Sequence, residues 1–157
     1  MVFDQIQNVI TIKIIILKNP VHLYRIFLYE LVMSRPLTIQ EQHNLAMNIV
    51  GKDLEAKGYE FLAVNSQLKR NPQFVCIDKN NQRYFVIVKT GPINELGITF
   101  DVIWMETFKV HARKNNAKVI FAGIGLGAKN DTKTPPLLNK EYAIQFDGLQ
   151  YLEVALN

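Results

Sequence analysis

The feature that most constrains this chain is an amphipathic helix whose two ends are marked in the sequence. Thr38 and Glu41 have the spacing of a capping box, in which a hydroxyl and a carboxylate satisfy backbone amides of the first turn. Gly58 can adopt the left-handed conformation that ends a helix. The apolar residues between them fall on one helical face: Ile39, Leu45, Ala46, Ile49, Val50 and Leu54. The pattern predicts a helix over about residues 39–57, and its apolar stripe requires another layer to cover it.

Short apolar segments after this helix predict strands. Three of them occupy residues 59–64, 74–77 and 84–88. The last two are separated by residues 78–82, Asp-Lys-Asn-Asn-Gln, which favour a hairpin turn because Asn tolerates positive φ. A polar, basic link over residues 65–72 joins the first strand to this hairpin.

The rest of the chain predicts a second helix and further strands. Asp101 can cap a helix over about residues 102–116, with a stripe made of Trp104, Met105, Phe108, His111 and Ala112. We expect strands at 119–122 and 142–146, an exposed loop at 127–139, and a short strand or helix at 149–154. The order α-β-β-β-α-β with a C-terminal addition predicts a single α/β domain.

Residues 1–32 are apolar, but they are interrupted in a way that a membrane-spanning helix is not. A span needs about 20 consecutive apolar residues. Polar residues and a proline break every window of that length: Lys13, Lys18, Pro20, His22, Arg25 and Glu30. A secretory signal would begin with basic residues, whereas the start of this chain carries Asp4 and no Lys or Arg before residue 9. We therefore expect no membrane span, no secretion and a cytoplasmic protein.

Three interpretations of residues 1–32 remain: an extra strand and helix, an amphipathic helix on a membrane surface, and an artefact of start-site choice. The second rests on four apolar residues: Leu23, Ile26, Phe27 and Leu31. We favour the third, because Ile, Lys, Asn, Tyr and Phe dominate the segment as in a translated AT-rich leader, and Met33 then opens a conventional start. On that interpretation the working domain is 33–157.

Charge and cysteine content exclude several classes of protein. Eighteen Lys and Arg against fourteen Asp and Glu leave a net charge of +4, which is too little for a polybasic protein but permits an acidic partner. One Cys excludes an internal disulfide framework, a four-cysteine zinc site and a cysteine-ligated iron–sulfur cluster held by this chain alone. Cys76 lies mid-strand, which favours a buried, inert thiol. The three histidines lack metal-ligand spacing, so we expect no metal and no cofactor.

Residues 123–127 read Gly-Ile-Gly-Leu-Gly and follow a predicted strand, where a dinucleotide-binding turn would lie. Such a turn must open a helix whose N-terminus faces the phosphates. The sequence instead continues with Lys129, Asn130, Asp131 and then Pro135-Pro136, without helical periodicity. We therefore expect a flexible loop rather than a nucleotide site.

The hairpin and the first helix together carry a family resemblance. Gly58-Tyr59 after the helix, Asn65 after the first strand, and Val88-Lys89-Thr90 at the end of the third resemble the PD-(D/E)xK, restriction-endonuclease-like fold over about residues 38–123. They look like a family of small bacterial proteins in which the third strand reads Phe-Val-Glu-Val-Lys-Thr. The resemblance implies a nuclease-like core. In its active members two carboxylates hold a divalent metal, and a lysine on the same strand positions or activates water.

Of the residues that the resemblance assigns to catalysis, only the lysine is kept, as Lys89. Ile87 stands at the acid two positions before it, and the preceding acid falls on Phe74 or on Gln73, depending on the alignment. The helix carboxylate of some members falls near Met47. Because Ile and Phe cannot ligate a metal, we expect a degenerate site and a binding or accessory module rather than an enzyme.

Two acids are the candidates for relocated metal ligands, Asp78 and Glu60, and the alternative they support is a metal-dependent nuclease. Four basic residues are candidates for phosphate contacts on the former substrate face: Lys69, Arg70, Arg83 and Lys89. Each has a solvated surface role as its alternative, and for Lys89 an ion pair with Asp78 is a third option. The expected partner is nucleic acid or another protein, and not a small molecule.

Residues 33–38 and 104–109, Met-Ser-Arg-Pro-Leu-Thr and Trp-Met-Glu-Thr-Phe-Lys, are similar to a compact bacterial family often labelled as the flavin-bearing component of a sodium-translocating NADH:quinone reductase. That label implies an accessory protein of a redox complex. The genuine flavin-bearing component is a much larger protein with a membrane anchor, a four-cysteine ferredoxin cluster, and flavin and NADH domains. One Cys cannot hold that cluster, and the chain has no flavin motif.

Overall fold

The computed structural model describes residues 34–95, 98–99 and 101–153, together with Val21, Tyr24, Arg25 and Leu28. The chain divides into two compact units, Met1–Arg35 and Pro36–Asn157. In the first unit the four separate residues have helical backbone and are exposed, and the residues predicted to form an amphipathic stripe lie outside the described ones. Within the described part, no helix has the length and apolar character needed to cross a membrane.

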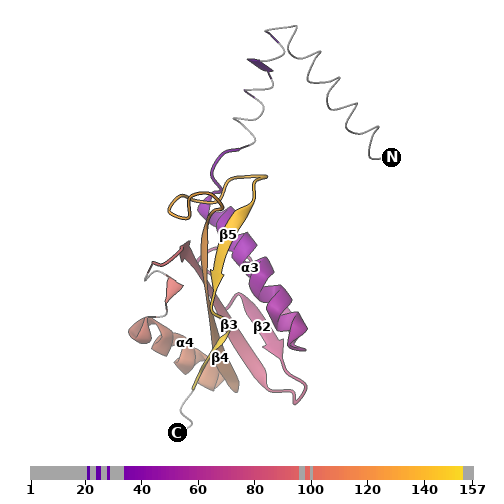
Figure 1. Cartoon of the computed structure of the whole chain (residues 1–157). Helices are drawn as coiled ribbons and strands as arrows, with labels where there is room; N and C mark the ends of the chain where they lie inside the picture. The colour runs from indigo at the N-terminus through magenta and orange to yellow at the C-terminus, as the bar shows by residue number, and fades with distance from the viewer. Residues whose placement is uncertain are drawn as a thin grey trace, which may run out of the picture. The chain divides into compact units, whose positions relative to one another are not determined.

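The described residues of the second unit form two helices and six strands, drawn in Figure 1. The helices are α3 (Ile39–Ala56) and α4 (Val102–Lys114). The strands are β1 (Glu60–Val64), β2 (Phe74–Ile77), β3 (Arg83–Pro92), β4 (Ala117–Ala128), β5 (Tyr142–Phe146) and β6 (Gln150–Leu152). The predicted α/β class and the order α-β-β-β-α-β are confirmed, and the C-terminal addition consists of two strands.

All six strands form one mixed sheet with the order β1-β2-β3-β4-β5. The pairs β1–β2 and β2–β3 are antiparallel, as the predicted hairpin requires. The pair β3–β4 is parallel, and α4 makes the crossover connection that parallel neighbours need. Two strands pair with the edge of β4 that faces away from β3. β6 pairs with residues 119–121, and β5 pairs with residues 124–128.

The helix α3 begins and ends as its sequence predicts. The Thr38 hydroxyl accepts a hydrogen bond from the Glu41 backbone nitrogen at 3.3 Å, and the Thr38 backbone nitrogen donates to Glu41 Oε2 at 2.8 Å. Gly58 has a φ of 80°, the left-handed conformation that reverses the chain toward β1. These contacts are local in sequence, and for that reason the sequence alone predicts them.

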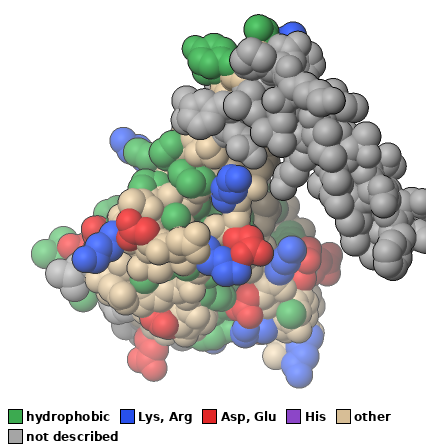
Figure 2. Space-filling view, turned by 45° about the horizontal axis from the view of Figure 1, so that its top comes forward, with side chains coloured by type: hydrophobic (Ala, Val, Ile, Leu, Met, Phe, Trp, Pro, Cys, Tyr) green, Lys and Arg blue, Asp and Glu red, His purple; other side chains and the backbone are tan. Residues whose placement is uncertain are grey.

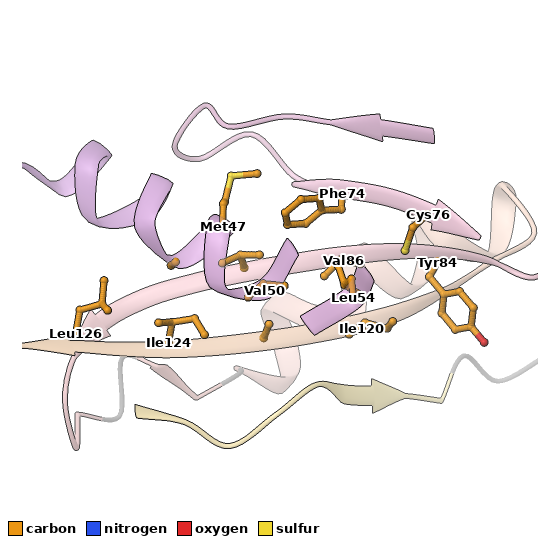
Figure 3. Packing of buried hydrophobic residues seen from close by; sticks show 13 residues of the cluster. Met47, Val50, Leu54, Phe74, Cys76, Tyr84, Val86, Ile120, Ile124 and Leu126 are labelled. Atoms are coloured by element: carbon orange, nitrogen blue, oxygen red, sulfur yellow. The ribbon is translucent and has the colours of Figure 1, made fainter. Parts of the chain in front are cut away.

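The helices cover opposite faces of the sheet (Figure 1). On one face, Met47, Val50 and Leu54 of α3 pack on even-numbered residues of β2, β3 and β4, as Figure 3 shows. On the other face, Met105 and Ala112 of α4 pack on odd-numbered residues of β3 and β4: Phe85, Ile87, Ala117, Val119 and Phe121. The alternation follows from the two-residue period of a strand. Both faces are apolar, which explains the continuous hydrophobic runs of β3 and β4.

The predicted stripe of α4 is only partly correct. Met105 and Ala112 are buried and Phe108 is half-buried, whereas Trp104 and His111 are exposed. Trp104 packs edge-on against Phe108, with their ring centroids 4.7 Å apart. The outward position of Trp104 leaves an aromatic surface at the N-terminal end of α4.

The flexible loop predicted at residues 123–127 is wrong, because this segment is the second half of β4. The glycines are needed where other segments cross the sheet. A Cβ on Gly123 would lie 1.9 Å from the Ile98 carbonyl oxygen, and one on Gly127 would lie 2.5 Å from that of Thr132. These contacts come from segments that are distant or separated by a loop, and a glycine pattern read along the chain does not reveal them.

Candidate functional site

None of the described strands pairs with one edge of β3 at its C-terminal end. β3 has ten residues and β2 has four, so β2 pairs only with residues 83–86 of β3. Over residues 88–92, β4 continues on one side, and the other side faces the link between β1 and β2. β3 ends at Pro92, which has no N–H to offer to another strand.

Gln73 extends the short strand β2 with its side chain. It is 1% exposed, and its Oε1 accepts a hydrogen bond from the Val88 backbone nitrogen at 2.8 Å. Its Nε2 donates to the Arg70 carbonyl oxygen at 2.9 Å and to Asn71 Oδ1 at 2.8 Å. Both N–H groups and the oxygen of this amide therefore form hydrogen bonds, and together they hold the basic link against β3.

A cavity of about 190 Å³ lies beyond Gln73, between the first turns of α3, the link and the end of β3. Two lysines line it, Lys69 and Lys89, and none of the described residues that line it is acidic. The full lining is Ile39, Gln42, His43, Leu68, Lys69, Asn71, Gln73, Val88, Lys89, Thr90 and Trp104. The cavity therefore has a cationic rim and a neutral interior.

Two buried polar atoms of this lining have no hydrogen-bond partner among the described residues. They are Nε2 of His43, a residue 2% exposed, and Oγ1 of Thr90. Burial lowers the pKa of His43, so its imidazole is neutral at pH 7. Buried polar atoms in proteins are nearly always paired, and an unpaired one has a desolvation cost of about 1–3 kcal/mol.

Lys89 lies on the α4 side of β3, where its ammonium group has two contacts. Its Nζ donates to the Thr99 carbonyl oxygen at 3.4 Å and lies 5.7 Å from the centroid of the Trp104 ring. A cation at this distance from an aromatic face is attracted to it. Trp104 keeps 37% of its surface exposed, so the rim combines a positive charge with an accessible aromatic ring.

The four basic residues predicted to contact phosphate fall into two places. Lys69 and Lys89 line the cavity, and Arg70 belongs to the same link. Arg83 is the first residue of β3, opposite Ile77 and Ala117, at the other end of the sheet. The structure therefore brings two of the four to one cavity, keeps Arg70 beside Lys69 along the chain, and places Arg83 elsewhere.

The residues at the positions that the nuclease resemblance assigns to catalytic acids lie partly in the core and partly at the cavity. Ile87 is fully buried against α4, and Phe74 packs in the α3-side core, stacked on Phe61 with ring centroids 5.3 Å apart. Gln73, the other candidate for the first acid, lines the cavity together with Lys89. Met47 is buried in the core, and His43, one turn earlier in α3, lines the cavity together with Ile39 and Gln42. The sequence alone gave His43 no role. The available signal was its position four residues before Met47, which places both residues on the same face of the helix.

The two acids considered as relocated metal ligands lie far from Lys89. Asp78 is in the β2–β3 turn, where its Oδ1 accepts from the backbone nitrogens of Asn80 and Gln82, each at 2.9 Å. Glu60 opens β1 opposite Ile77, at the same end. Six residues of strand, about 20 Å, separate the start of β3 from Lys89, so the ion pair considered between Asp78 and Lys89 does not form. No cluster of three or more His, Cys, Asp or Glu that could hold a metal occurs in the described part.

A larger cavity of about 490 Å³ lies at that hairpin end. Arg113 and Lys118 line it, but Glu153 does too, so its charges are of both signs. Arg113 already donates to Glu106 Oε1 at 3.0 Å through Nη2. Arg113 Nε is also buried without a hydrogen-bond partner among the described residues, so unpaired atoms alone do not separate the two cavities. The smaller cavity beside Lys89 is the better candidate for function because its charges have one sign.

Comparison with known proteins identifies a family for most of the chain. Residues 40–152 match a family model described as Domain of unknown function (DUF8840). No curated protein and no solved structure matches the chain. The matched range begins in α3 and ends with β6, and thus includes the whole sheet, α4, and all of α3 and of the cavity lining except Ile39. The chain therefore belongs to the DUF8840 family.

Proposed function

We propose that this protein is a nuclease-like module that binds nucleic acid without cutting it. The observation that carries the proposal is the cavity at the end of β3, where Lys69 and Lys89 meet beside Gln73 and no described lining residue is acidic. The order α-β-β-β-α-β, with one helix on each face of a mixed sheet, supports a restriction-endonuclease-like arrangement. In such an arrangement Lys89 would lie at the former active site.

The side chains at this place favour binding over hydrolysis. Metal-dependent phosphodiester cleavage needs carboxylates that hold the cation and leave room for water and phosphate. Gln73 uses its amide oxygen for the Val88 N–H, and Ile87 is an alkyl side chain enclosed by the core. Lys89 is still able to contact a phosphate oxygen, which requires no metal.

The surface around the cavity suits a short contact with a single strand. Lys69 and Lys89 offer two positive charges, and Trp104 offers a ring on which a base can stack. Figure 2 shows basic and acidic side chains interspersed over the face in view, without a broad patch of one sign. On that face, phosphate contacts would therefore be few and local.

Fluorescence anisotropy of an end-labelled single-stranded oligonucleotide, measured with the full chain in EDTA, tests the proposal. We expect binding that weakens with rising salt, because bound phosphates release counterions. Lys69→Ala or Lys89→Ala should weaken binding and reduce the salt slope by about 0.7 to 1 each. The matched control is Lys79→Ala in the β2–β3 turn, which should change neither. A salt-independent affinity, or an equal loss in the control, would contradict the proposal.

A further inference from the structure

Resting on the proposed function, we infer that the cavity between α3 and the end of β3 is an oxyanion site for the terminal phosphoryl group of a nucleic-acid strand. The proposal concerns the buried end of the cavity, formed by His43 and Thr90, and not only its basic rim. A strand bound in this way must end in a phosphate.

The buried polar atoms define what the cavity can bind. Thr90 Oγ1 is a hydroxyl without a described partner, and His43 Nε2 can donate when the neutral imidazole carries its proton on that nitrogen. A phosphoryl oxygen accepts hydrogen bonds only, so both atoms would be satisfied by it. Lys69 and Lys89 add two positive charges at the same cavity. The set therefore consists of two neutral donors and two cations, which matches a small anion with several oxygens.

The backbone of β3 adds a further donor. The Val86 carbonyl oxygen accepts from the Gln73 backbone nitrogen at 2.9 Å, and the Val88 nitrogen donates to the Gln73 side chain. Even-numbered residues of β3 therefore direct their backbone groups to the open edge, since these groups alternate along a strand. Thr90 is the next even-numbered residue, so its N–H faces the same edge as the cavity that its side chain lines.

The size of the cavity favours a strand end over an internal phosphodiester. Its volume of about 190 Å³ is below that of pockets that enclose drug-sized ligands, which begin at about 300 Å³. An internal phosphodiester carries one charge and is flanked by a sugar on each side. A terminal phosphate carries up to two charges and projects from one sugar, so it can reach buried donors while the sugar and base remain at the rim beside Trp104.

The test compares oligonucleotides of one sequence that end in a 5′-phosphate, a 3′-phosphate or hydroxyls, with the label placed at the other end. In anisotropy titrations in EDTA and without inorganic phosphate, we expect one phosphorylated form to bind at least about tenfold more tightly than the hydroxyl form. Thr90→Val keeps the shape of the side chain and removes the hydroxyl, so it should reduce that preference to about threefold or less. His43→Gln should also reduce the preference, and Thr107→Val on the exposed face of α4 is the matched control.

Inorganic phosphate separates the two sources of a phosphoryl group. Trp104 is the single Trp of the chain, so its fluorescence reports on the cavity alone. We expect phosphate to change this fluorescence and to compete with the phosphorylated strand, but to bind more weakly than the strand.

Equal affinity of phosphorylated and hydroxyl strands would overturn the inference while leaving the proposed function intact. A preference that Thr90→Val and His43→Gln both leave unchanged would also overturn it. If phosphate saturates the Trp104 signal and no oligonucleotide binds, the assignment to a strand end is wrong and the proposed function fails with it.

Discussion

The side-chain oxygen of Gln73 accepts a hydrogen bond from the backbone nitrogen of Val88 at 2.8 Å. If β2 were longer at its N-terminal end, its backbone would pair with β3 at this place. This bond ends the β2–β3 ladder and leaves the edge of β3 open beyond it. The Gln73 amide nitrogen holds the link through Arg70 and Asn71. One neutral side chain therefore joins the end of β3 to the link that carries Lys69, and both line the cavity.

Gln73→Leu should lower the free energy of unfolding by about 1–3 kcal/mol, because the Val88 N–H and the Arg70 carbonyl lose their partner within a buried site. Urea denaturation followed by Trp104 fluorescence measures the change. Gln67→Leu, on the exposed part of the same link, is the control and should change stability by less than about 0.5 kcal/mol. Equal stability of the two variants would show that the Gln73 hydrogen bonds do not hold the link.

Two glycines should respond to alanine in opposite directions. In Gly123→Ala the new Cβ would lie 1.9 Å from the Ile98 carbonyl oxygen, so the loop after β3 must move, and we expect a loss of about 3 kcal/mol or more. In Gly51→Ala, inside α3, the nearest atoms belong to the Phe74 ring at 3.7 Å, and the helix should gain about 0.5–1 kcal/mol. Thermal unfolding of both variants measures the contrast. A Gly123→Ala protein as stable as the parent would contradict the described crossing of β4 by this loop.

The contrast between α3 and β4 shows which parts of the fold can be predicted from sequence. The ends of α3 depend on Thr38, Glu41 and Gly58, all of which act on backbone groups within a turn, so local pattern suffices. Residues 123–127 are a strand because they pair with the end of β3 and with β5, and Gly123 and Gly127 leave room for Ile98 and Thr132, all of which are tertiary contacts. Local composition therefore predicted a loop where the structure has a strand.

The same distinction applies to the candidate site. Lys89 could be singled out from the sequence because of the residues that surround it along the chain, and the structure places it at the cavity. His43 and Thr90 could not be paired, because only the packing of α3 on the end of β3 brings them to one cavity. The role of Gln73 was also hidden, since its side chain replaces a strand residue and follows no sequence pattern.

Cys76 should be unreactive in the folded protein. Burial, followed by the nearby negative charge of Asp78, raises the pKa of its thiol to about 12, so almost none of it is thiolate at pH 8. Ellman's reagent at pH 8 should therefore label the native protein far more slowly than the protein in 8 M urea. Rapid stoichiometric labelling of the native protein would contradict the burial of this thiol.

His43 should make the folded state less stable in mild acid. Its folded-state pKa lies below the ordinary 6.5, so below pH 6.5 the unfolded chain binds a proton that the folded protein does not. The contribution of His43 to stability is thus complete above pH 6.5 and decreases as the pH falls toward the folded-state pKa. Comparing urea midpoints at pH 8 and pH 5.5 in phosphate-free buffers, we expect a smaller difference in His43→Gln than in the parent. The same pH dependence in His43→Gln and in the parent would contradict this account.

The most direct test of binding without cleavage uses supercoiled plasmid with an exposed single-stranded region, incubated with the full chain and either Mg²⁺ or Mn²⁺. Half of each sample is run directly on a gel, and half is run after the protein has been digested. We expect the plasmid to be retarded in the first half and to remain supercoiled in the second, with retardation reduced in Lys89→Ala. Metal-dependent conversion to nicked or linear plasmid that Lys89→Ala abolishes would contradict the account and identify the protein as a nuclease.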